Sequence, residues 1–396
     1  MKTKSKINIA IIGAGASGVI CAIIAKINNP SLNITVYEKN DKLGRKILAS
    51  GNGRCNITNT QISSKNYIGQ NIDFVSYCLN IFNFKQTQKF FNDIGLIFDI
   101  KGDGKVYPLS NEAKSVTNIL EQKANSLGIN FVFNCAITQI KLKNTKFIIN
   151  DNIYDKAVIS TGLGAATQLG STTDGLKFAK DLGHNIISVY PALVGLHIDS
   201  PICKKLFGVK CHSEVELYIN NILTTTVKGD VLFTKYGVSG FAILDISTIA
   251  SKALCENKDV QISINLLPSY SRGQLLKLLS NIQKNNPYKS IKDILTGVIP
   301  TKLIDIVVSN SIKQTVNNIL NMRFNICDTH GFKHAEASGG GVDTSLIDDK
   351  TMQSEKVKNL YFTGEALDIV GQRGGYNFAF AWASGYVAGI QLSKEK

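Results

Sequence analysis

The spacing of three glycines near the start of the chain is that of a phosphate-binding turn. Residues 13–18 form the motif GxGxxG and directly follow the apolar, β-branched run of residues 7–12, which predicts a buried strand. In such a turn the first glycine permits a tight bend, the second lets the backbone approach a pyrophosphate, and the third lets a helix pack on its strand. The amides at the start of that helix bind the anion. The predicted contacts are Gly13, Gly15, Ala16, Ser17 and Gly18.

An acidic residue completes this unit. Apolar residues 19–24 predict one face of a helix, and residues 33–37 predict a second strand that finishes at Glu38. Glu38 lies 20 residues beyond Gly18, where a carboxylate accepts hydrogen bonds from adenosine ribose hydroxyls and repels a 2′-phosphate. The unit therefore favours FAD or NAD over NADP at this site.

The segment that follows favours FAD over NAD. Residues 39–59 contain glycines, small polar residues and two arginines, which suit a chain that wraps an extended ligand and offers amides to a pyrophosphate or a flavin ring. The alternative is a Gly/Asn-rich surface loop. The predicted contacts here are Lys39, Gly44, Arg45, Lys46, Ser50, Gly51, Gly53, Arg54, Cys55 and Asn56.

A second glycine-rich segment lies near the other end of the chain. Residues 359–363 predict a short strand, and a helix rich in small residues begins near Tyr376, with N-terminal amides that can stabilise negative charge on a reduced flavin. Glu365 or Asp368 can bind ribityl hydroxyls.

As catalytic residues we predict Tyr376, a proton donor, and Asn377, a hydrogen-bond partner of the flavin; alternatively Tyr376 only packs the turn. The predicted contacts are Thr161, Gly162, Gly364, Glu365, Asp368, Gly374, Gly375, Tyr376 and Asn377.

Two of these segments resemble a known family. LGRKILASGNGRCNITN at 43–59 and TGEALDIVGQRGGYNFAFAWASG at 363–385 are similar to the hallmark segments of the BaiN/RdsA-like flavoproteins. The resemblance covers nearly the whole chain and implies an NAD(P)/FAD-dependent oxidoreductase; some members are described as aminoacetone oxidases. Departures at Leu163, Thr167, Thr173, Lys235 and Phe241 lie outside the two hallmarks, so the resemblance implies FAD binding without naming a substrate.

The fold class expected is α/β, with a discontinuous Rossmann-like FAD-binding domain. If both ends of the chain contact one flavin, another domain must be inserted between them. Alternating segments within residues 191–265 predict a β-rich, barrel-like part, and residues 270–322 predict a small helical part. The predicted division is therefore 1–190 and 335–396 for the FAD-binding domain and 191–334 for an inserted substrate domain.

Other chemistries have little support in the sequence. There is no GxSxG, HExxH or Walker motif, and no metal site is expected: His330 and His334 are four apart, but the intervening Gly331 favours a polar role. Eight cysteines without a CxxC pair indicate reduced thiols and a cytoplasmic protein. The glycines at 13, 15 and 18 interrupt the uncharged run at residues 7–25, so we expect no membrane anchor.

The net charge of +14 raises the possibility of a phosphate-bearing partner. The lysines are spread along the chain, so no dedicated nucleic-acid surface is expected.

We predict an FAD-dependent oxidoreductase whose flavin is reduced by NAD(P)H and passes a hydride to a small organic substrate. The alternatives are a flavin-dependent amine oxidase, an RNA-modifying flavoenzyme and a non-catalytic FAD-binding protein; the oligomeric state is left open.

Overall fold

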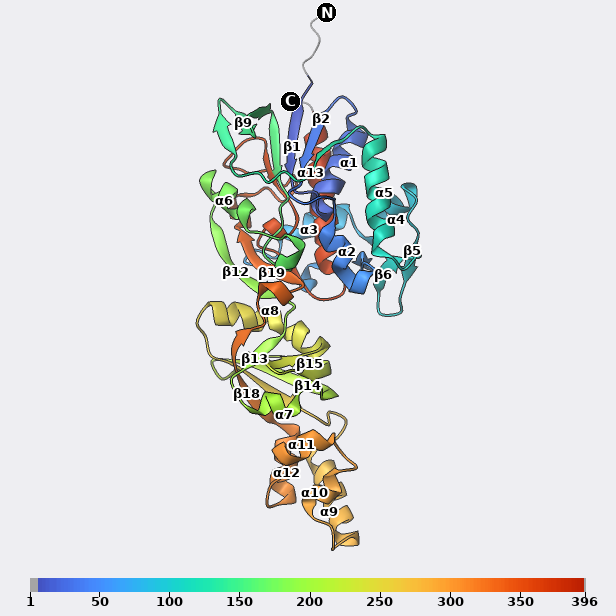
Figure 1. The fold of residues 1–396 in the computed structure, drawn as a ribbon, viewed down its shortest axis with the longest axis vertical. Helices are drawn as coiled ribbons and strands as arrows, with labels where there is room; N and C mark the ends of the chain where they lie inside the picture. Colours follow the sequence, from blue (N-terminus) through green and yellow to red (C-terminus); the bar gives the residue numbers. More distant parts are fainter. Residues whose placement is uncertain (1–5, 395–396) are drawn as a thin grey trace, which may run out of the picture. The chain divides into compact units, whose positions relative to one another are not determined.

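The computed structural model of the protein describes residues 6–394 and divides into two compact units (Figure 1). One unit extends to Val189 and resumes at Glu336, and the other is Tyr190–Ala335. Each unit has its own cluster of buried apolar side chains. The first unit is thus built from both ends of the chain, which confirms the discontinuous architecture predicted.

A five-stranded parallel sheet is the centre of the first unit. Its order is β20-β11-β1-β2-β7. The strands are β1 (Asn8–Ile12), β2 (Asn33–Tyr37), β7 (Asn130–Val132), β11 (Lys156–Ile159) and β20 (Leu360–Phe362). Ile9, Ala10 and Ile11 of β1 have no exposed surface, as expected for a central strand covered on both faces. Because all five strands are parallel, their carboxyl ends meet at one edge of the sheet.

Two helices from opposite ends of the chain pack closely together. α1 (Ala16–Asn28) follows the glycine-rich turn, and α13 (Tyr376–Ser393) is the last helix of the described residues. A Cβ on Gly385 of α13 would lie 2.3 Å from the Ser17 carbonyl oxygen, and one on Gly389 would lie 2.7 Å from the Cys21 carbonyl oxygen. The missing side chains therefore let the backbones of the two helices touch.

Further helices and strands complete this unit. The remaining helices are α2 (Arg45–Ala49), α3 (Phe74–Ile81), α4 (Phe84–Asp93), α5 (Ala113–Ser126) and α6 (Asp174–Asp181). The remaining strands are β3 (Thr58–Asn59), β4 (Tyr67–Ile68), β5 (Phe98–Ile100), β6 (Lys105–Pro108), β8 (Lys141–Lys143), β9 (Lys146–Ile149), β10 (Asn152–Tyr154), β19 (Ala337–Val342) and β21 (Val370–Gly371). β12 (Ile186–Ala192) pairs with β19.

The second unit contains a closed barrel in the order β13-β16-β15-β14-β17-β18. Its strands are β13 (Leu196–Ile198), β14 (Lys210–Ile219), β15 (Ile222–Phe233), β16 (Gly237–Ser239), β17 (Val260–Asn265) and β18 (Met322–Thr329). Alternate residues of β14, including Val215 and Leu217, are fully buried, which gives the period of two expected for a barrel wall. A barrel-like part is confirmed, but its last strand, β18, lies beyond the range 191–265 that the sequence predicted.

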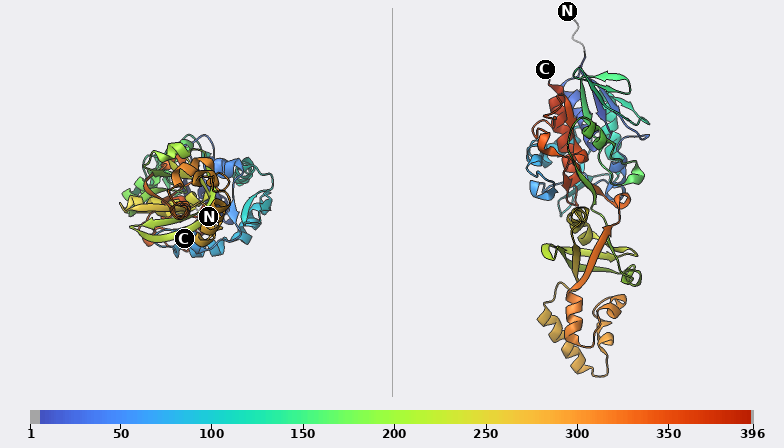
Figure 2. Two further views of the ribbon diagram at one scale, coloured as in Figure 1. Left: turned by 90° about the horizontal axis from the view of Figure 1, so that it is seen from below. Right: turned by 90° about the vertical axis from the view of Figure 1, so that its left-hand side faces the viewer.

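The helices of the second unit are α7 (Ile202–Leu206), α8 (Phe241–Cys255), α9 (Arg272–Asn285), α10 (Ile291–Leu295), α11 (Thr301–Val307) and α12 (Ile312–Leu320). The last four form the predicted helical part and gather at one end of the unit (Figure 2). Capping boxes at Ser271 and Ser290 fix the starts of α9 and α10.

Between residues 6 and 394, no helix is both long and apolar enough to span a bilayer.

Candidate cofactor site

Four strands of the central sheet deliver loops to the same edge. Gly13 follows β1, Glu38 follows β2, Ser160 follows β11 and Thr363 follows β20. The Gly13 amide donates to the Tyr37 carbonyl at 2.8 Å, and the Ser160 hydroxyl donates to the Gly13 carbonyl at 2.9 Å. The Thr363 amide donates to the Ile159 carbonyl at 3.1 Å. The turn after β1 is thus held between its neighbours, where open α/β sheets bind ligands.

The three glycines of the turn have different surroundings. Gly13 has φ +106°, which favours glycine. A Cβ on Gly18 would lie only 2.1 Å from the Gly13 carbonyl oxygen, so this glycine is required for close packing. A Cβ on Gly15 would meet nothing within 4 Å, and Gly15 is the N-cap of α1. Open space therefore lies over a helix start whose first amides have no intrahelical acceptor.

The Glu38 carboxylate is held in place by the backbone. Its Oε2 accepts a hydrogen bond from the Ala14 amide at 3.0 Å, and its Oε1 accepts two from Asn40, from the backbone amide at 2.9 Å and from Nδ2 at 2.7 Å. A carboxylate has about four acceptor positions. Three are occupied here, so one remains for a ligand hydroxyl.

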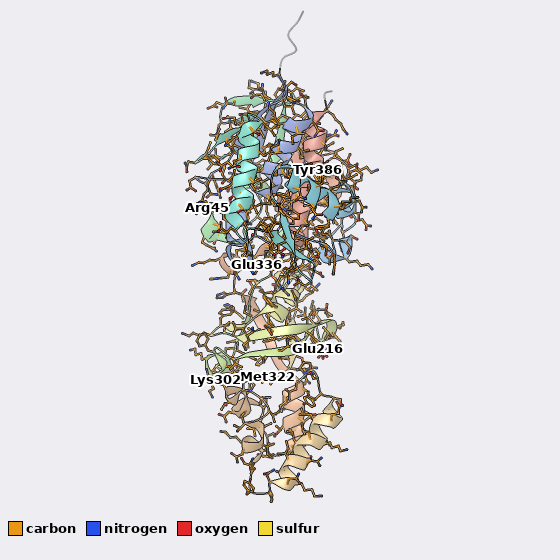
Figure 3. The ribbon with its side chains drawn as sticks, turned by 90° about the vertical axis from the view of Figure 1, so that its right-hand side faces the viewer. Arg45, Glu216, Lys302, Met322, Glu336 and Tyr386 are labelled. Atoms are coloured by element: carbon orange, nitrogen blue, oxygen red, sulfur yellow. The ribbon has the colours of Figure 1, made fainter. Side chains whose placement is uncertain are left out.

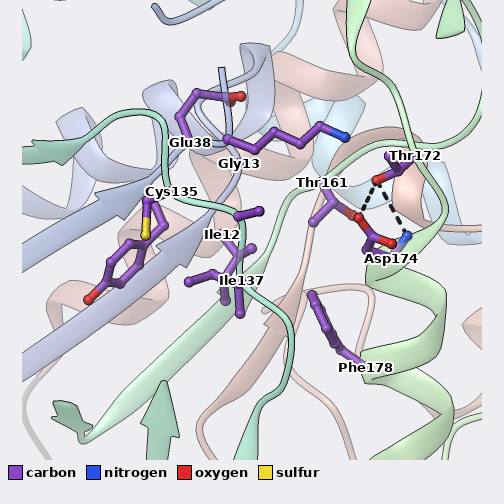
Figure 4. Close-up of a pocket in the computed structure, with 12 residues that line it drawn as sticks. Ile12, Gly13, Glu38, Cys135, Ile137, Thr161, Thr172, Asp174 and Phe178 are labelled. Carbon is purple, nitrogen blue, oxygen red and sulfur yellow. Dashed lines mark hydrogen bonds between the residues drawn. The ribbon is translucent and has the colours of Figure 1, made fainter. Parts of the chain in front are cut away.

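Glu38 lines a cleft beside the glycine turn, shown in Figure 4. The other walls come from the segment after β7, with Cys135 and Ile137, and from α6, with Asp174 and Phe178. Thr161, from the loop after β11, also lines it. Among these residues the sequence analysis identified Glu38 and Thr161, whereas the residues from the β7 and α6 segments carry no motif and were missed.

An ion pair joins residues from two distant segments, and residues from two further segments lie against it. Lys46 Nζ on α2 lies 2.7 Å from Glu365 Oε2, in the loop after β20. The Glu365 Oε1 accepts a hydrogen bond from the Ser338 amide at 2.8 Å. A Cβ on Gly162 would lie 3.4 Å from Glu365 Oε2 and 3.9 Å from Lys46 Nζ. Three predicted contacts thus come together at this point.

Ser338 is a site residue that the sequence analysis missed. Its amide holds Glu365, and its hydroxyl accepts a hydrogen bond from the Ala165 amide at 2.9 Å. The side chain is fully buried in β19. A serine followed by three glycines, at residues 338–341, is a weak signal that could have identified it.

The loop of residues 50–56 contains tight left-handed turns. Positive φ angles occur at Gly51, Asn52, Gly53 and Cys55. Burial raises the pKa of the Cys55 thiol to about 12, so it remains protonated at neutral pH and is a poor nucleophile. The Arg54 guanidinium lies 5.0 Å from the centre of the Tyr107 ring. This loop therefore offers backbone amides rather than a reactive thiol.

The start of α13 packs directly on the segment that follows this loop. A Cβ on Gly375 would lie 2.5 Å from the Thr58 carbonyl oxygen, and the Asn59 side-chain amide donates to the Gly374 carbonyl at 2.9 Å. Thr58 and Asn59 belong to β3 and were not singled out, although both lie in the first hallmark segment. The two glycine-rich segments of the sequence are thus neighbours in space.

Of the two predicted catalytic residues, Asn377 makes contacts within the protein. Its Oδ1 accepts from the Gly371 amide at 2.8 Å, and its Nδ2 donates to the Gly371 carbonyl at 2.9 Å. It therefore holds the preceding turn, and its contact with a flavin stays a prediction.

Tyr376 is buried, and its ring packs edge-on against Tyr67 with centroids 6.3 Å apart. Burial, with a smaller effect of Asp103, raises the pKa of the Tyr376 phenol. The phenol is therefore protonated at neutral pH and is a weaker acid than an exposed tyrosine, so its role as a proton donor stays a prediction.

Others among the predicted contacts bond to local or to distant partners within the protein. The Gly44 amide donates to the Ala14 carbonyl at 2.9 Å, which ties α2 to the glycine turn. The Gly364 amide donates to the Ser384 hydroxyl at 2.9 Å. Asp368 accepts from the Gln70 amide at 2.9 Å, beside β4 and β21. Arg45 Nη1 donates to Asn40 Oδ1 at 2.9 Å, and Ser50 Oγ donates to the Ile47 carbonyl at 2.8 Å.

Two buried hydroxyls suggest that the site fits an extended ligand. Within residues 6–394, neither Thr58 Oγ1 nor Thr363 Oγ1 has a hydrogen-bond partner. An unpaired buried hydroxyl costs about 1–3 kcal/mol. Thr58 lies beside the start of α13 and Thr363 lies at the end of β20, next to Gly364. With the open space over Gly15 and the single free position on Glu38, these groups fit a dinucleotide that spans the sheet edge.

Comparison with known proteins gives a match along nearly the whole chain. A family model described as HI0933-like protein Rossmann domain matches residues 7–391. The 3-dehydro-bile acid delta(4,6)-reductase of Clostridium scindens is 32% identical over 400 residues, which cover 96% of this chain and 98% of that protein. The ribosomal RNA dihydrouridine synthase of Haemophilus influenzae is 28% identical over 407 residues, covering 97% and 98%.

A solved structure shares the fold. The 3-ketosteroid delta1-dehydrogenase of Sterolibacterium denitrificans superposes with a TM-score of 0.51 at 10% sequence identity, covering 98% of this chain and 100% of that one. At this identity the likeness concerns the fold alone.

Proposed function

Because the chain belongs to the HI0933-like Rossmann-domain family, a family of FAD-dependent oxidoreductases, we propose that it is a reductase that takes electrons from NAD(P)H. Its substrate is a small organic molecule with a carbon–carbon double bond conjugated to a carbonyl group. The observation that carries the proposal is the convergence of the glycine turn, Glu38, the Lys46–Glu365 pair and the start of α13 around one sheet edge.

Each part of the site has a role in holding the cofactor. The amides at the start of α1 bind the pyrophosphate, and the remaining acceptor position on Glu38 binds a ribose hydroxyl. Glu365, whose carboxylate is oriented by Ser338, offers acceptors for ribityl hydroxyls. When bound, FAD supplies the hydride transfer.

The protein's own residues supply charge stabilisation and a proton. The first amides of α13 present the positive end of a helix dipole, which favours negative charge near that end. The buried Tyr376 phenol retains its proton and is the donor we assign to the substrate carbon that does not receive hydride. Arg373 is a further cation in the same turn.

The substrate class is supported by the names of the two relatives. Reduction of a bile acid and formation of dihydrouridine each add two hydrogens across a carbon–carbon double bond in a ring. A carbonyl conjugated to that bond makes it electrophilic towards hydride. We therefore favour cyclic enones as test substrates.

We also propose a cytoplasmic location, where NAD(P)H is available and the eight free cysteines would stay reduced.

An anaerobic absorbance titration tests this proposal. The purified protein is titrated with NADH and with NADPH while the visible flavin band is followed, and a cyclic enone is then added. Rapid bleaching by one donor and recovery of the band on adding the enone are expected. A band that neither donor bleaches would instead favour an amine oxidase or a non-catalytic FAD-binding protein. If the protein keeps no flavin band after it is incubated with FAD and the unbound FAD is removed, the cofactor assignment is refuted.

A second candidate substrate is a uracil ring in RNA. The net charge of +14 favours it, since cationic proteins bind polyanions. RNA that copurifies with the protein, and recovery of the flavin band on adding RNA in place of an enone, would identify this form of the reaction.

A further inference from the structure

Tyr376, the residue to which we assign the proton, is held by its backbone and ring but not by its hydroxyl. A Cβ on Gly371 would lie 2.9 Å from Tyr376 Cβ, and one on Gly374 would lie 3.4 Å from Tyr376 Cε2. The side chain therefore lies along the backbone of the turn that precedes α13. Among the residues that the structure describes, the Tyr376 hydroxyl has no hydrogen-bond partner, so its proton remains available to a ligand.

Tyr67 reaches Tyr376 from a different segment. Its strand, β4, pairs antiparallel with β21, which sets Tyr67 opposite Gly371. The Gln372 amide donates to the Asn66 carbonyl at 2.8 Å and extends this pairing by one residue. Tyr67 is only 2% exposed. The strand pair thus fixes Tyr67 beside the turn that precedes α13.

The ring of Tyr67 contacts two rings of α13. It packs edge-on against Tyr376, with centroids 6.3 Å apart, and against Phe380, with centroids 6.2 Å apart. These two residues are four apart and lie on one face of the helix. Further along α13, Tyr386, labelled in Figure 3, stacks on Phe82 with centroids 4.3 Å apart. The helix is therefore anchored at two points, and Tyr67 holds the one at its start.

The hydroxyls of the two neighbouring tyrosines are used differently. The Tyr67 hydroxyl donates to the Tyr376 carbonyl at 3.0 Å. A phenol has one proton to donate, so that of Tyr67 is not available to a ligand. Burial, with smaller effects of Cys78 and Tyr376, raises the pKa of the Tyr67 phenol, and the bond is therefore kept at neutral pH.

We propose that Tyr67 is a positioning residue, which fixes the start of α13 and so aims the Tyr376 hydroxyl at the substrate. The inference rests on the proposed function. One carbon of the double bond takes the hydride and the other takes the Tyr376 proton, which solvent water then replaces; Tyr67 transfers no proton. Packing alone would need only the ring of Tyr67, whereas its hydroxyl bonds to the residue that must be aimed.

Tyr67→Phe tests the proposal, because it keeps the ring and removes only the hydroxyl. In stopped-flow measurements, the limiting rate at which a cyclic enone reoxidises the reduced flavin should fall at least about tenfold, since misplacing a catalytic group can cost about 100-fold. The half-saturating enone concentration and the rate of bleaching by NADH or NADPH should be unchanged, because neither uses the Tyr376 proton.

A double-mutant cycle separates positioning from general packing. Tyr376→Phe should lower the reoxidation rate by about 100-fold or more, and adding Tyr67→Phe to it should cause no further loss, since Tyr67 acts through the Tyr376 hydroxyl. Losses that multiply in the double variant would overturn the proposal.

The matched control is Tyr154→Phe. It removes a buried hydroxyl of the same unit, which hydrogen-bonds to the Tyr37 hydroxyl at 2.7 Å. This variant should keep the wild-type rates. A loss equal to that of Tyr67→Phe would also overturn the proposal, since any buried tyrosine hydroxyl would then have the same effect.

Fluorine NMR of fluorotyrosine-labelled apoprotein provides a measurement that needs no flavin. The line of Tyr376 is assigned by its loss in Tyr376→Phe. It should broaden in Tyr67→Phe, because the ring then samples several positions, and should keep its wild-type width in Tyr154→Phe. An unchanged width in Tyr67→Phe would show that Tyr67 does not hold Tyr376.

The wild-type protein distinguishes failure of this inference from failure of the proposed function. If no enone reoxidises the wild-type flavin, the reductase proposal is refuted and the aiming role with it, whatever the NMR line shows. If an enone reoxidises the wild-type flavin and Tyr67→Phe leaves that rate unchanged, the role of Tyr67 alone is refuted.

Discussion

At the scale of single residues, Gly15 and Gly18 share one motif but have different physical roles. A side chain on Gly18 would collide with the Gly13 backbone, whereas one on Gly15 would enter open space. The requirement for glycine at Gly18 is therefore imposed by the protein itself. At Gly15, where φ is −79° and any residue is allowed, the fold imposes no such requirement, and we predict that the ligand does.

This difference predicts opposite behaviour for two alanine variants. Gly18→Ala should lower the free energy of unfolding by about 1–3 kcal/mol even without FAD, because the site is overpacked. Gly15→Ala should melt like the wild-type apoprotein but bind FAD at least about tenfold more weakly, a loss of about 1.4 kcal/mol. Thermal melting by circular dichroism and a fluorescence titration with FAD measure the two effects. Normal FAD binding by a stable Gly15→Ala protein would argue against a pyrophosphate at the start of α1.

Other residue roles depend on partners that no local pattern reveals. Lys46 and Glu365 are 319 residues apart, and their pairing appears only when α2 and the loop after β20 meet. Ser338 holds Glu365 from β19, outside every strong motif. Asn377 was predicted correctly to lie at the start of a helix, but only the structure shows its side chain bound to Gly371.

At the scale of elements, the contact between α1 and α13 links the two ends of the chain. It depends on small residues, since a Cβ on Gly385 would lie 2.3 Å from the Ser17 carbonyl oxygen and 2.5 Å from Ile20 Cγ2. Ser17 is in the first turn of α1, beside the predicted pyrophosphate site. Pushing the helices apart should therefore affect both stability and cofactor binding.

Gly385→Ala tests this coupling. We expect its free energy of unfolding to fall by about 1–3 kcal/mol and its FAD affinity to fall as well. Gly273→Ala on α9 is the control, because a Cβ there meets nothing within 4 Å and alanine favours helices by up to about 1 kcal/mol. Chemical denaturation and FAD titration of both variants provide the measurement; equal effects of the two substitutions would contradict the packing argument.

At the scale of the whole molecule, two separate apolar clusters predict two unfolding events. Each unit has its own core, with Ile11 in one and Val215 in the other. Differential scanning calorimetry should resolve two transitions, and added FAD should raise only the one that belongs to the Rossmann-like unit. Ile11→Val should lower that same transition, and Val215→Ala should lower only the other. A single transition that FAD shifts as a whole would show that the units unfold together.

The sequence by itself determined the features that neighbouring residues encode. The glycine turn with its strand and helix, the alternating barrel strands and the α9–α12 region follow from local periodicity and turn chemistry, and all appear in the structure. The discontinuous FAD-binding fold was also predicted, because both ends of the chain carry segments suited to one ligand.

Only the tertiary structure decided how these segments combine into a site. The Ser338 support and the cleft walls formed by Cys135 and Asp174 come from segments with no motif of their own. The Thr58 and Thr363 hydroxyls belong to the two hallmark segments, but only the fold shows that they are buried without a partner among the described residues. Local sequence fixes backbone preferences within a few residues, whereas contacts across hundreds of residues are set by packing of the completed fold.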